Sequence, residues 1–265
     1  MGAVTVPRHR RPTLHFLTEI RSFAPVFLDT EADMSAVTRH RAAATARGRR
    51  YSLVSYVLLA AARAVAAHPE ANAAIRGRLR PRIARYSTVD AKLTFDRRVG
   101  GGRAVLSAVL PDLAGAGLDE IQDRVDRYRG ADPEHGPEFG GARMLRRLPF
   151  PVGAVLYRWG VRPLHRRAGV MGTFAVSSLG HRPVDGFHSI GGTTVTFGVG
   201  RVLDRAVVRD GAVAVAPVMR LSMCFDHRVI DGAEAADLLA DAVSELENLP
   251  GVEAPLASAE RRGQA

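Results

Sequence analysis

A histidine with a carboxylate on each side stands near the C-terminal end of the chain, in the segment CFDHRVIDG at residues 224–232. Histidine is the side chain whose unperturbed pKa lies nearest to neutrality, and a general base works best when its pKa is near the operating pH. The segment follows a predicted strand and precedes a helical pattern that begins at Ala233. Rigid elements on both sides would hold His227 in place, so the spacing indicates proton transfer, with Asp226 and Asp231 as its neighbours.

The pattern His-Arg-x-x-Asp-Gly occurs a second time at residues 181–186 and is followed by His188. This copy contains Pro183, which is typical of an exposed loop rather than a strand-to-helix junction. Loop residues often carry function, so His181 and His188 remain candidates for a direct role. The histidines and aspartates could instead bind a metal, but their spacing matches no common zinc pattern, and we expect no metal.

Two neighbouring serines, Ser177 and Ser178, end a predicted strand over residues 173–178. A serine at a strand end can be a nucleophile, can donate a hydrogen bond to an oxyanion, or can form a turn. The Gly-x-Ser-x-Gly pattern of many hydrolases is absent from this segment, which disfavours a hydrolase triad. On spacing alone a turn-forming role is the default, and the other roles stay open.

Hydrophobic periodicity predicts the elements that position these residues. Strands are expected at residues 26–33, 83–86, 89–95, 103–110, 173–178, 193–201, 206–208, 212–215 and 218–225, and helices at 35–47, 53–67, 118–128 and 233–249. An arginine-rich segment, residues 142–167, is expected to form two helices interrupted by Pro149 and Pro151. It would either pack on the body with a solvated basic face or face a membrane surface or an acyl chain. The order of elements predicts one α/β (α+β) domain, a mixed sheet flanked by helices.

Composition limits the class of protein. The chain has 265 residues, 46% of them hydrophobic, and contains no apolar run of about 18 residues that could span a membrane. Cys224 is its only cysteine, which excludes a disulfide framework and favours a reducing, cytoplasmic setting. We expect a basic N-terminal arm over residues 1–12, one domain over 13–249 and a loose tail over 250–265.

The net charge is +10, and arginine carries almost all of the positive charge, because Lys92 is the only lysine. Such a balance can indicate a nucleic acid or a phosphorylated cofactor as partner. Aromatic residues make up only 6% of the chain, and no nucleic-acid motif accompanies the charge. We therefore expect a compositional bias with a local phosphate site, and no nucleic-acid partner.

Two segments together resemble a known family. The sequence FDHRVIDG at residues 225–232 is similar to the signature of the dihydrolipoamide acyltransferases, the second component of 2-oxoacid dehydrogenase complexes. The sequence GTFAVSSLG at residues 172–180 is similar to that family's Gly-Thr-Phe-x-x-Ser-x-Leu-Gly strand. Weaker matches in the right order lie at residues 66–73, 197–202 and 209–211, and the resemblance covers residues 14–249.

This resemblance implies a chloramphenicol-acetyltransferase-like fold and a homotrimer with active sites between subunits. It implies that His227 is the general base, that Ser177 donates a hydrogen bond to the tetrahedral oxyanion, and that Asp231 supports the histidine. Ser178 is the less favoured oxyanion donor. The implied substrates are acyl-CoA and a thiol such as dihydrolipoamide, with the lipoyl group on a separate protein.

The chain also departs from that family. It shows no lipoyl domain, no subunit-binding domain and no Ala/Pro-type linker, so we expect a stand-alone catalytic domain. Residues 181–192 replace an Asn-Pro-Pro-like stretch, and the basic segment at residues 142–167 is unlike the usual core. The acceptor therefore stays open. A small-molecule O- or N-acyltransferase of the same fold and a non-catalytic trimeric assembly protein are the alternatives.

Overall fold

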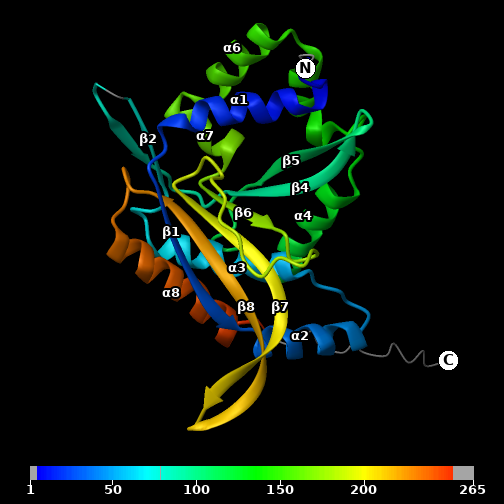
Figure 1. The fold of residues 1–265 in the computed structure, drawn as a ribbon, viewed down its shortest axis with the longest axis vertical. Coiled ribbons are helices and arrows are strands. Elements are labelled where there is room, and N and C mark those ends of the chain that lie inside the picture. Colours follow the sequence, from blue (N-terminus) through cyan, green and yellow to red (C-terminus); the bar gives the residue numbers. More distant parts are fainter. Residues whose placement is uncertain (1–4, 78, 253–265) are drawn as a thin grey trace, which may run out of the picture.

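The computed structural model describes residues 5–77 and 79–252, which form a mixed sheet flanked by helices, as predicted (Figure 1). Its strands are ordered β1-β8-β7-β6-β4-β5, and β2 and β3 form a separate hairpin. The strands are β1 Pro25–Asp33, β2 Ala73–Arg76, β3 Arg82–Arg85, β4 Ala91–Val99, β5 Gly102–Leu110, β6 Phe174–Ser178, β7 Val195–Arg209 and β8 Ala212–Asp226. The helices are α1 Arg11–Glu19, α2 Ser35–Ala46, α3 Leu53–Ala67, α4 Leu118–Gly130, α5 Gly140–Arg147, α6 Phe150–Val161, α7 Leu164–Met171 and α8 Gly232–Asn248.

The chain ends lie partly outside the described residues. Of the expected N-terminal arm, residues 1–4 are not described, Arg8–Arg10 form a short 3-10 helix, and α1 begins at Arg11. Of the expected tail, residues 253–265 are not described. No helix within the described ranges is both long and apolar enough to span a membrane.

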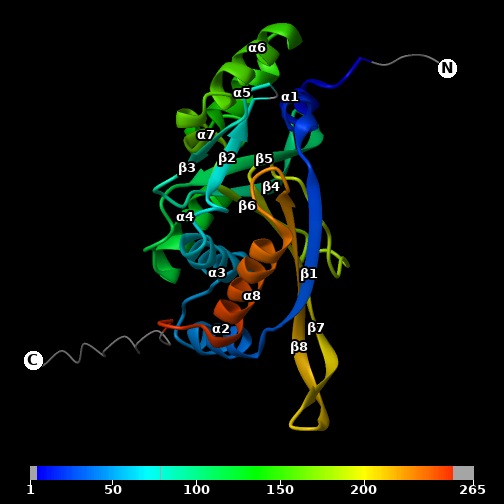
Figure 2. The ribbon, with the colours of Figure 1, turned by 90° about the vertical axis from the view of Figure 1, so that its left-hand side faces the viewer.

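The hydrophobic core lies between one face of the sheet and helices α3 and α8, which pack against each other (Figure 2). The helix predicted over residues 53–67 is confirmed as α3, and because its sequence is apolar on nearly every side, most of its residues are buried. The Ser52 hydroxyl accepts a hydrogen bond from the backbone N–H of Ser55 and so caps the start of the helix. This packing makes the central part of the sheet a rigid support.

Helices α1, α5, α6 and α7, called the cap helices below, gather at the end of the molecule that holds β4 and β5 (Figures 1 and 2). The sequence predicted two helices over residues 142–167, interrupted at Pro149 and Pro151. The break at Pro149 is confirmed, but Pro151 does not interrupt a helix, because it lies in the first turn of α6, where a missing backbone N–H costs no hydrogen bond. The second interruption falls at Pro163, directly before α7.

Strands β7 and β8 are longer than predicted. The sequence suggested separate strands at 193–201, 206–208, 212–215 and 218–225, whereas each pair forms one continuous strand with a bulge between Val199 and Val202. Beyond this bulge the two strands extend past the hydrophobic core as a two-stranded ribbon, and Val208, Val213 and Val215 are exposed on it. Because the ribbon has no buried face, apolar and polar residues do not alternate regularly along it. Asp210 and Gly211, a pair typical of two-residue hairpin turns, form the turn between β7 and β8, with both residues at positive φ.

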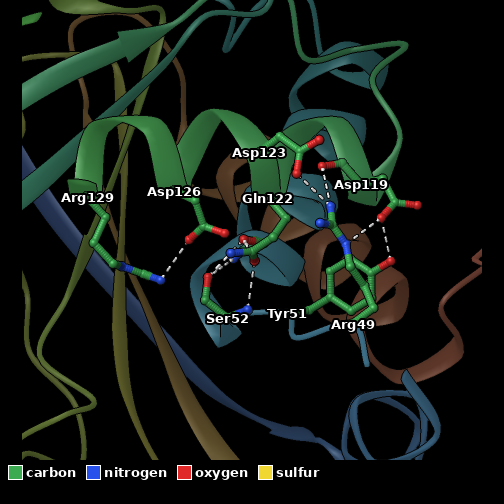
Figure 3. Close-up of polar contacts among 9 residues, drawn as sticks. Arg49, Tyr51, Ser52, Asp119, Gln122, Asp123, Asp126 and Arg129 are labelled. Carbon is green, nitrogen blue, oxygen red and sulfur yellow. Dashed lines mark hydrogen bonds and ion pairs between the residues drawn. The ribbon is translucent and has the colours of Figure 1, made fainter. Parts of the chain in front are cut away.

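Helix α4 is fastened to the start of α3 by polar contacts (Figure 3). The side-chain oxygen of Gln122, which is 2% exposed, accepts hydrogen bonds from the Ser52 backbone N–H at 2.8 Å and the Ser55 hydroxyl at 2.7 Å. Around this buried amide, Arg49 bridges Asp119 and Asp123 at the surface. The buried hydrogen bonds should matter more for stability than the exposed ion pairs.

We expect the substitution Gln122→Leu to lower the free energy of unfolding by about 2 kcal/mol, because it removes the acceptor of two buried donors. Urea denaturation at a fixed protein concentration measures the change. Asp126→Asn is the matched control, since Asp126 forms only an exposed ion pair with Arg129 and should cost less than about 0.5 kcal/mol. Equal losses in the two variants would contradict this account of α4.

Candidate active site

His227 lies in the turn that directly follows β8, at one end of the sheet. Its backbone N–H donates to the carbonyl oxygen of Ala24 at 2.9 Å, which ties the turn to the start of β1. The imidazole packs beside the Phe225 ring with 5.6 Å between centroids, and its side chain is 47% exposed. The backbone of His227 is therefore fixed while its ring can reach a bound molecule.

Asp226 is a buried structural charge. Its carboxylate accepts two hydrogen bonds from the Arg228 guanidinium, at 2.8 and 2.6 Å, and one from the Ala24 backbone N–H at 3.3 Å. These hydrogen bonds raise the pKa of Arg228 above its usual value. Asp226 thus pairs with an arginine, and this pair holds the turn that carries His227.

Asp231 takes the N-cap position of α8, and its Oδ1 lies 3.4 Å from Nδ1 of His227. Its side chain is 89% exposed. At this length and exposure the contact is an electrostatic one, which gains strength when the imidazole is protonated. The contact also directs Nδ1 of His227 toward Asp231 and leaves Nε2 on the other side of the ring.

Ser177 lies on β6 in the middle of the sheet and is half-buried. Its Oγ accepts a hydrogen bond from the Thr94 hydroxyl on β4 at 2.9 Å, so its own proton is left to donate elsewhere. Ser178 points to the other face of the strand, and its Oγ accepts from the backbone N–H of Gly180 at 3.4 Å. Ser178 thus makes the turn-forming contact, whereas the hydroxyl proton of Ser177 is not used by the contact with Thr94.

A cavity of about 690 Å³ lies between the cap helices and the sheet face that carries Ser177. This face is opposite the one covered by α3, because Leu93 and Val176, the neighbours of the cavity-lining residues on β4 and β6, point into the core. Apolar side chains from α1, β5, α6 and α7 form most of the wall, and Lys92, Thr94 and Ser177 are polar groups on it. A concave, mainly apolar site with a few polar groups is typical of small-molecule binding.

The structure does not bring Ser177 and His227 together within one chain. Ser177 pairs with Gly198 on β7, and Gly198 pairs with Ser222 on β8, five residues before His227. Residue and strand spacings in a sheet then separate the two by on the order of 20 Å. The lining of the cavity includes Ser177 but not His227.

The second histidine motif lies in the loop between β6 and β7, as predicted, and its carboxylate is occupied elsewhere. Asp185 pairs with Arg201 at 2.6 Å rather than with His181, which is exposed. His188 lies 3.5 Å from Asp29 on β1. Among the described residues, no three His, Cys, Asp or Glu side chains are grouped so that they could hold a metal ion.

Gly198 and Gly200 on β7 explain why this loop lies flat on the sheet. A Cβ atom at Gly198 would overlap the backbone oxygen of Phe187, and one at Gly200 would overlap that of Asp185. The loop therefore covers the outer face of β7 and is held there by backbone contact.

Two functional candidates were missed from the sequence, Thr94 and Lys92. Both were inside a predicted strand, and its alternation places them on the face opposite Leu93. This alternation could have shown that Thr94 and Lys92 share a face. The contact of Thr94 with Ser177 could not be found in that way, because it depends on the pairing of β4 with β6, which joins residues more than 80 positions apart.

Comparison with known proteins confirms the resemblance in part of the chain. The model of the family described as 2-oxoacid dehydrogenases acyltransferase (catalytic domain) matches residues 165–252. The dihydrolipoyllysine-residue acetyltransferase component of the pyruvate dehydrogenase complex of Bacillus subtilis is 55% identical over 42 residues, 16% of this chain and 10% of that protein. The chain thus matches only about a tenth of that relative's length.

Solved structures confirm the fold class. Azotobacter vinelandii dihydrolipoamide acetyltransferase superposes with a TM-score of 0.71 at 20% identity, over 94% of this chain and 92% of that one. That structure was studied for the role of a serine, a histidine and an asparagine in the catalytic mechanism. Chloramphenicol acetyltransferase superposes with a TM-score of 0.50 at 19% identity, over 91% of this chain and 96% of that one. The predicted chloramphenicol-acetyltransferase-like fold is therefore confirmed.

Proposed function

We propose that this chain, which carries the catalytic-domain sequence of the 2-oxoacid dehydrogenase acyltransferases over residues 165–252, moves an acyl group between coenzyme A and a thiol such as dihydrolipoamide. His227 acts as the general base and Ser177 as the oxyanion donor. The observation that carries the proposal is the Ser177 hydroxyl, which accepts from Thr94 and can direct its own proton into the cavity.

The reaction follows from the chemistry of these groups. Nε2 of His227 takes the proton of the acceptor thiol, and the resulting thiolate attacks the carbonyl carbon of the acyl-CoA thioester. The carbonyl oxygen becomes an oxyanion and accepts the hydrogen bond of Ser177. The bond between carbon and the CoA sulfur then breaks, and the departing CoA thiolate takes the proton back from His227. No covalent acyl-enzyme forms.

The active site requires two copies of the chain. Because His227 and Ser177 lie far apart in one subunit, we propose that His227 of one copy faces the Ser177 cavity of a second copy in a homotrimer. The half-exposed imidazole supports this arrangement, since a base at the protein surface can work in a neighbouring subunit's cavity. The ribbon of β7 and β8 supports it too, since its exposed valines offer an apolar contact surface.

Asp231 distinguishes this chain from the Azotobacter protein. The asparagine studied in that protein lies four positions after its histidine, and at the same spacing this chain has Asp231. A carboxylate 3.4 Å from Nδ1 stabilises the imidazolium that forms when His227 takes a proton, which a neutral amide would do less well. We propose that Asp231 supports the base in this way.

Cys224 has no part in the chemistry that we propose. Burial is the main reason why the pKa of its thiol is raised to about 12, so it is not a thiolate at neutral pH. A free, buried cysteine as the only one in the chain supports our placement of the protein in the cytoplasm.

The proposal is tested with the purified protein, acetyl-CoA and a panel of acceptors, by chromatographic measurement of the CoA released. We expect release with dihydrolipoamide. Release only with small alcohols or amines would instead identify a small-molecule O- or N-acyltransferase. No loss of acyl-CoA with any acceptor would overturn the enzymatic proposal and favour a trimeric assembly protein.

A further inference from the structure

The only lysine of the chain lies on the wall of the Ser177 cavity. Lys92 is 6% exposed and comes from β4, two residues before Thr94 and on the same face. Its Nζ donates to the carbonyl oxygen of Gly191 at 3.0 Å and lies 4.3 Å from the centre of the Phe16 ring. The Met171 sulfur, a weak acceptor, lies 4.0 Å from the same nitrogen, so among the described residues Gly191 supplies the one strong acceptor for its three N–H donors.

Lys92 lacks a counter-charge within the part of the chain that the structure describes. None of the ion pairs among residues 5–77 and 79–252 involves it. The nearby Arg167 on α7 has the same sign and donates to the backbone oxygens of Val161 and Gly192. Glu138, the acidic residue of the cavity wall, forms its ion pair with Arg127.

Burial of an unpaired ammonium is unfavourable, so the pKa of the group falls. Burial, and to a smaller extent the charge of Arg167, together lower the pKa of Lys92 to about 7. An arginine at this position could not become neutral in the same way, because the pKa of a guanidinium is too high. An anionic group inside the cavity would supply the missing partner and favour the charged lysine.

We propose that the cavity binds an acyl acceptor with a short apolar body and one anionic group, and that Lys92 binds this anion while the reacting atom lies at Ser177. The inference rests on the proposed function, which assigns Ser177. Thr94 contacts Ser177, and the Cα atoms of Lys92 and Thr94 are about 7 Å apart, so a chain of several carbons would span the two groups. A free acceptor with a carboxylate fits this site better than a neutral lipoyl amide.

Dihydrolipoate and dihydrolipoamide form a matched pair of acceptors, because they share the dithiol and the chain and differ only in a terminal carboxylate or amide. With acetyl-CoA as donor, we expect kcat/KM to be about tenfold or more higher for dihydrolipoate, as a charge-assisted hydrogen bond in a buried site would give. In Lys92→Met, which keeps the apolar stem and removes the charge, this preference should vanish. In the control Arg39→Met, which removes an exposed arginine of α2, the preference should remain.

The outcomes separate this inference from the proposed function. Turnover of neither acceptor by the unchanged protein contradicts the proposed function. Turnover of both with the same ratio in the unchanged protein and in Lys92→Met contradicts the role of Lys92 alone. If Lys92→Met does not fold, the inference is tested by calorimetric measurement of ligand binding to the unchanged protein. Oxidised lipoate should then bind about tenfold or more tightly than lipoamide, and equal affinities would overturn the inference.

Discussion

Replacing His227 by glutamine should lower kcat/KM for acyl transfer from acetyl-CoA to dihydrolipoamide by about 10²- to 10⁴-fold, the usual contribution of a positioned general base. Glutamine has a similar size and can still bond to Asp231, but it cannot take a proton at neutral pH. The melting temperature should stay close to that of the unchanged protein, because the backbone N–H of His227 and the buried Asp226–Arg228 pair hold the turn. Steady-state kinetics and calorimetry measure the two quantities.

His181→Gln is the matched control for this result. His181 belongs to the same six-residue pattern, but it is exposed on the loop before β7, and its motif aspartate pairs with Arg201. The control should keep nearly full activity. If it lost more activity than His227→Gln, the assignment of the base to the second motif would be wrong.

Replacing Ser177 by alanine should lower kcat by about 10²- to 10³-fold, because one oxyanion donor contributes roughly 3 kcal/mol in the transition state. KM should change little, since the hydrogen bond forms to the oxyanion and not to the ground-state carbonyl. The Thr94 hydroxyl would lose its acceptor, a modest cost at a half-buried position. Measurement of kcat and KM separately, with acetyl-CoA varied, tests both parts.

Ser178→Ala serves as the control for Ser177. The two residues are adjacent, yet Ser178 accepts only from the backbone N–H of Gly180 and faces away from the cavity. We expect less than about a threefold change in kcat for this variant. A rise in KM with unchanged kcat in Ser177→Ala would show that the serine binds the substrate and does not stabilise the oxyanion.

Local signals in the sequence predicted much of the fold. Hydrophobic periodicity predicted α3 over residues 53–67 and α8 over residues 233–249, because periodicity depends on neighbouring residues. His227 was placed correctly at a strand-to-helix junction for the same reason. Its role stays a prediction, since the chemistry is not tested by the fold.

What could not be predicted depends on contacts between distant segments. The cavity forms because helices from residues 11–19 and 140–171 cover strands from residues 91–110. No local sequence pattern predicts this packing of distant segments. The Thr94–Ser177 contact has the same origin, because strand order decides it. The single lysine was noted only as a count, since its burial without a partner is a property of the folded chain.

The separation of Ser177 and His227 within a subunit has a consequence for inheritance. If each site combines the serine of one copy with the histidine of the next, a copy without His227 inactivates the site at its neighbour's serine. Its own Ser177 still works in the site that receives a histidine from another copy. Each defective copy would then remove one site, so mixed assemblies would lose activity in proportion to the fraction of defective copies. Two alleles that are each inactive alone, one without Ser177 and one without His227, would restore some complete sites when expressed together. Complementation between two inactive copies is thus the genetic result expected if the distance between Ser177 and His227 in one chain is closed by a neighbouring copy.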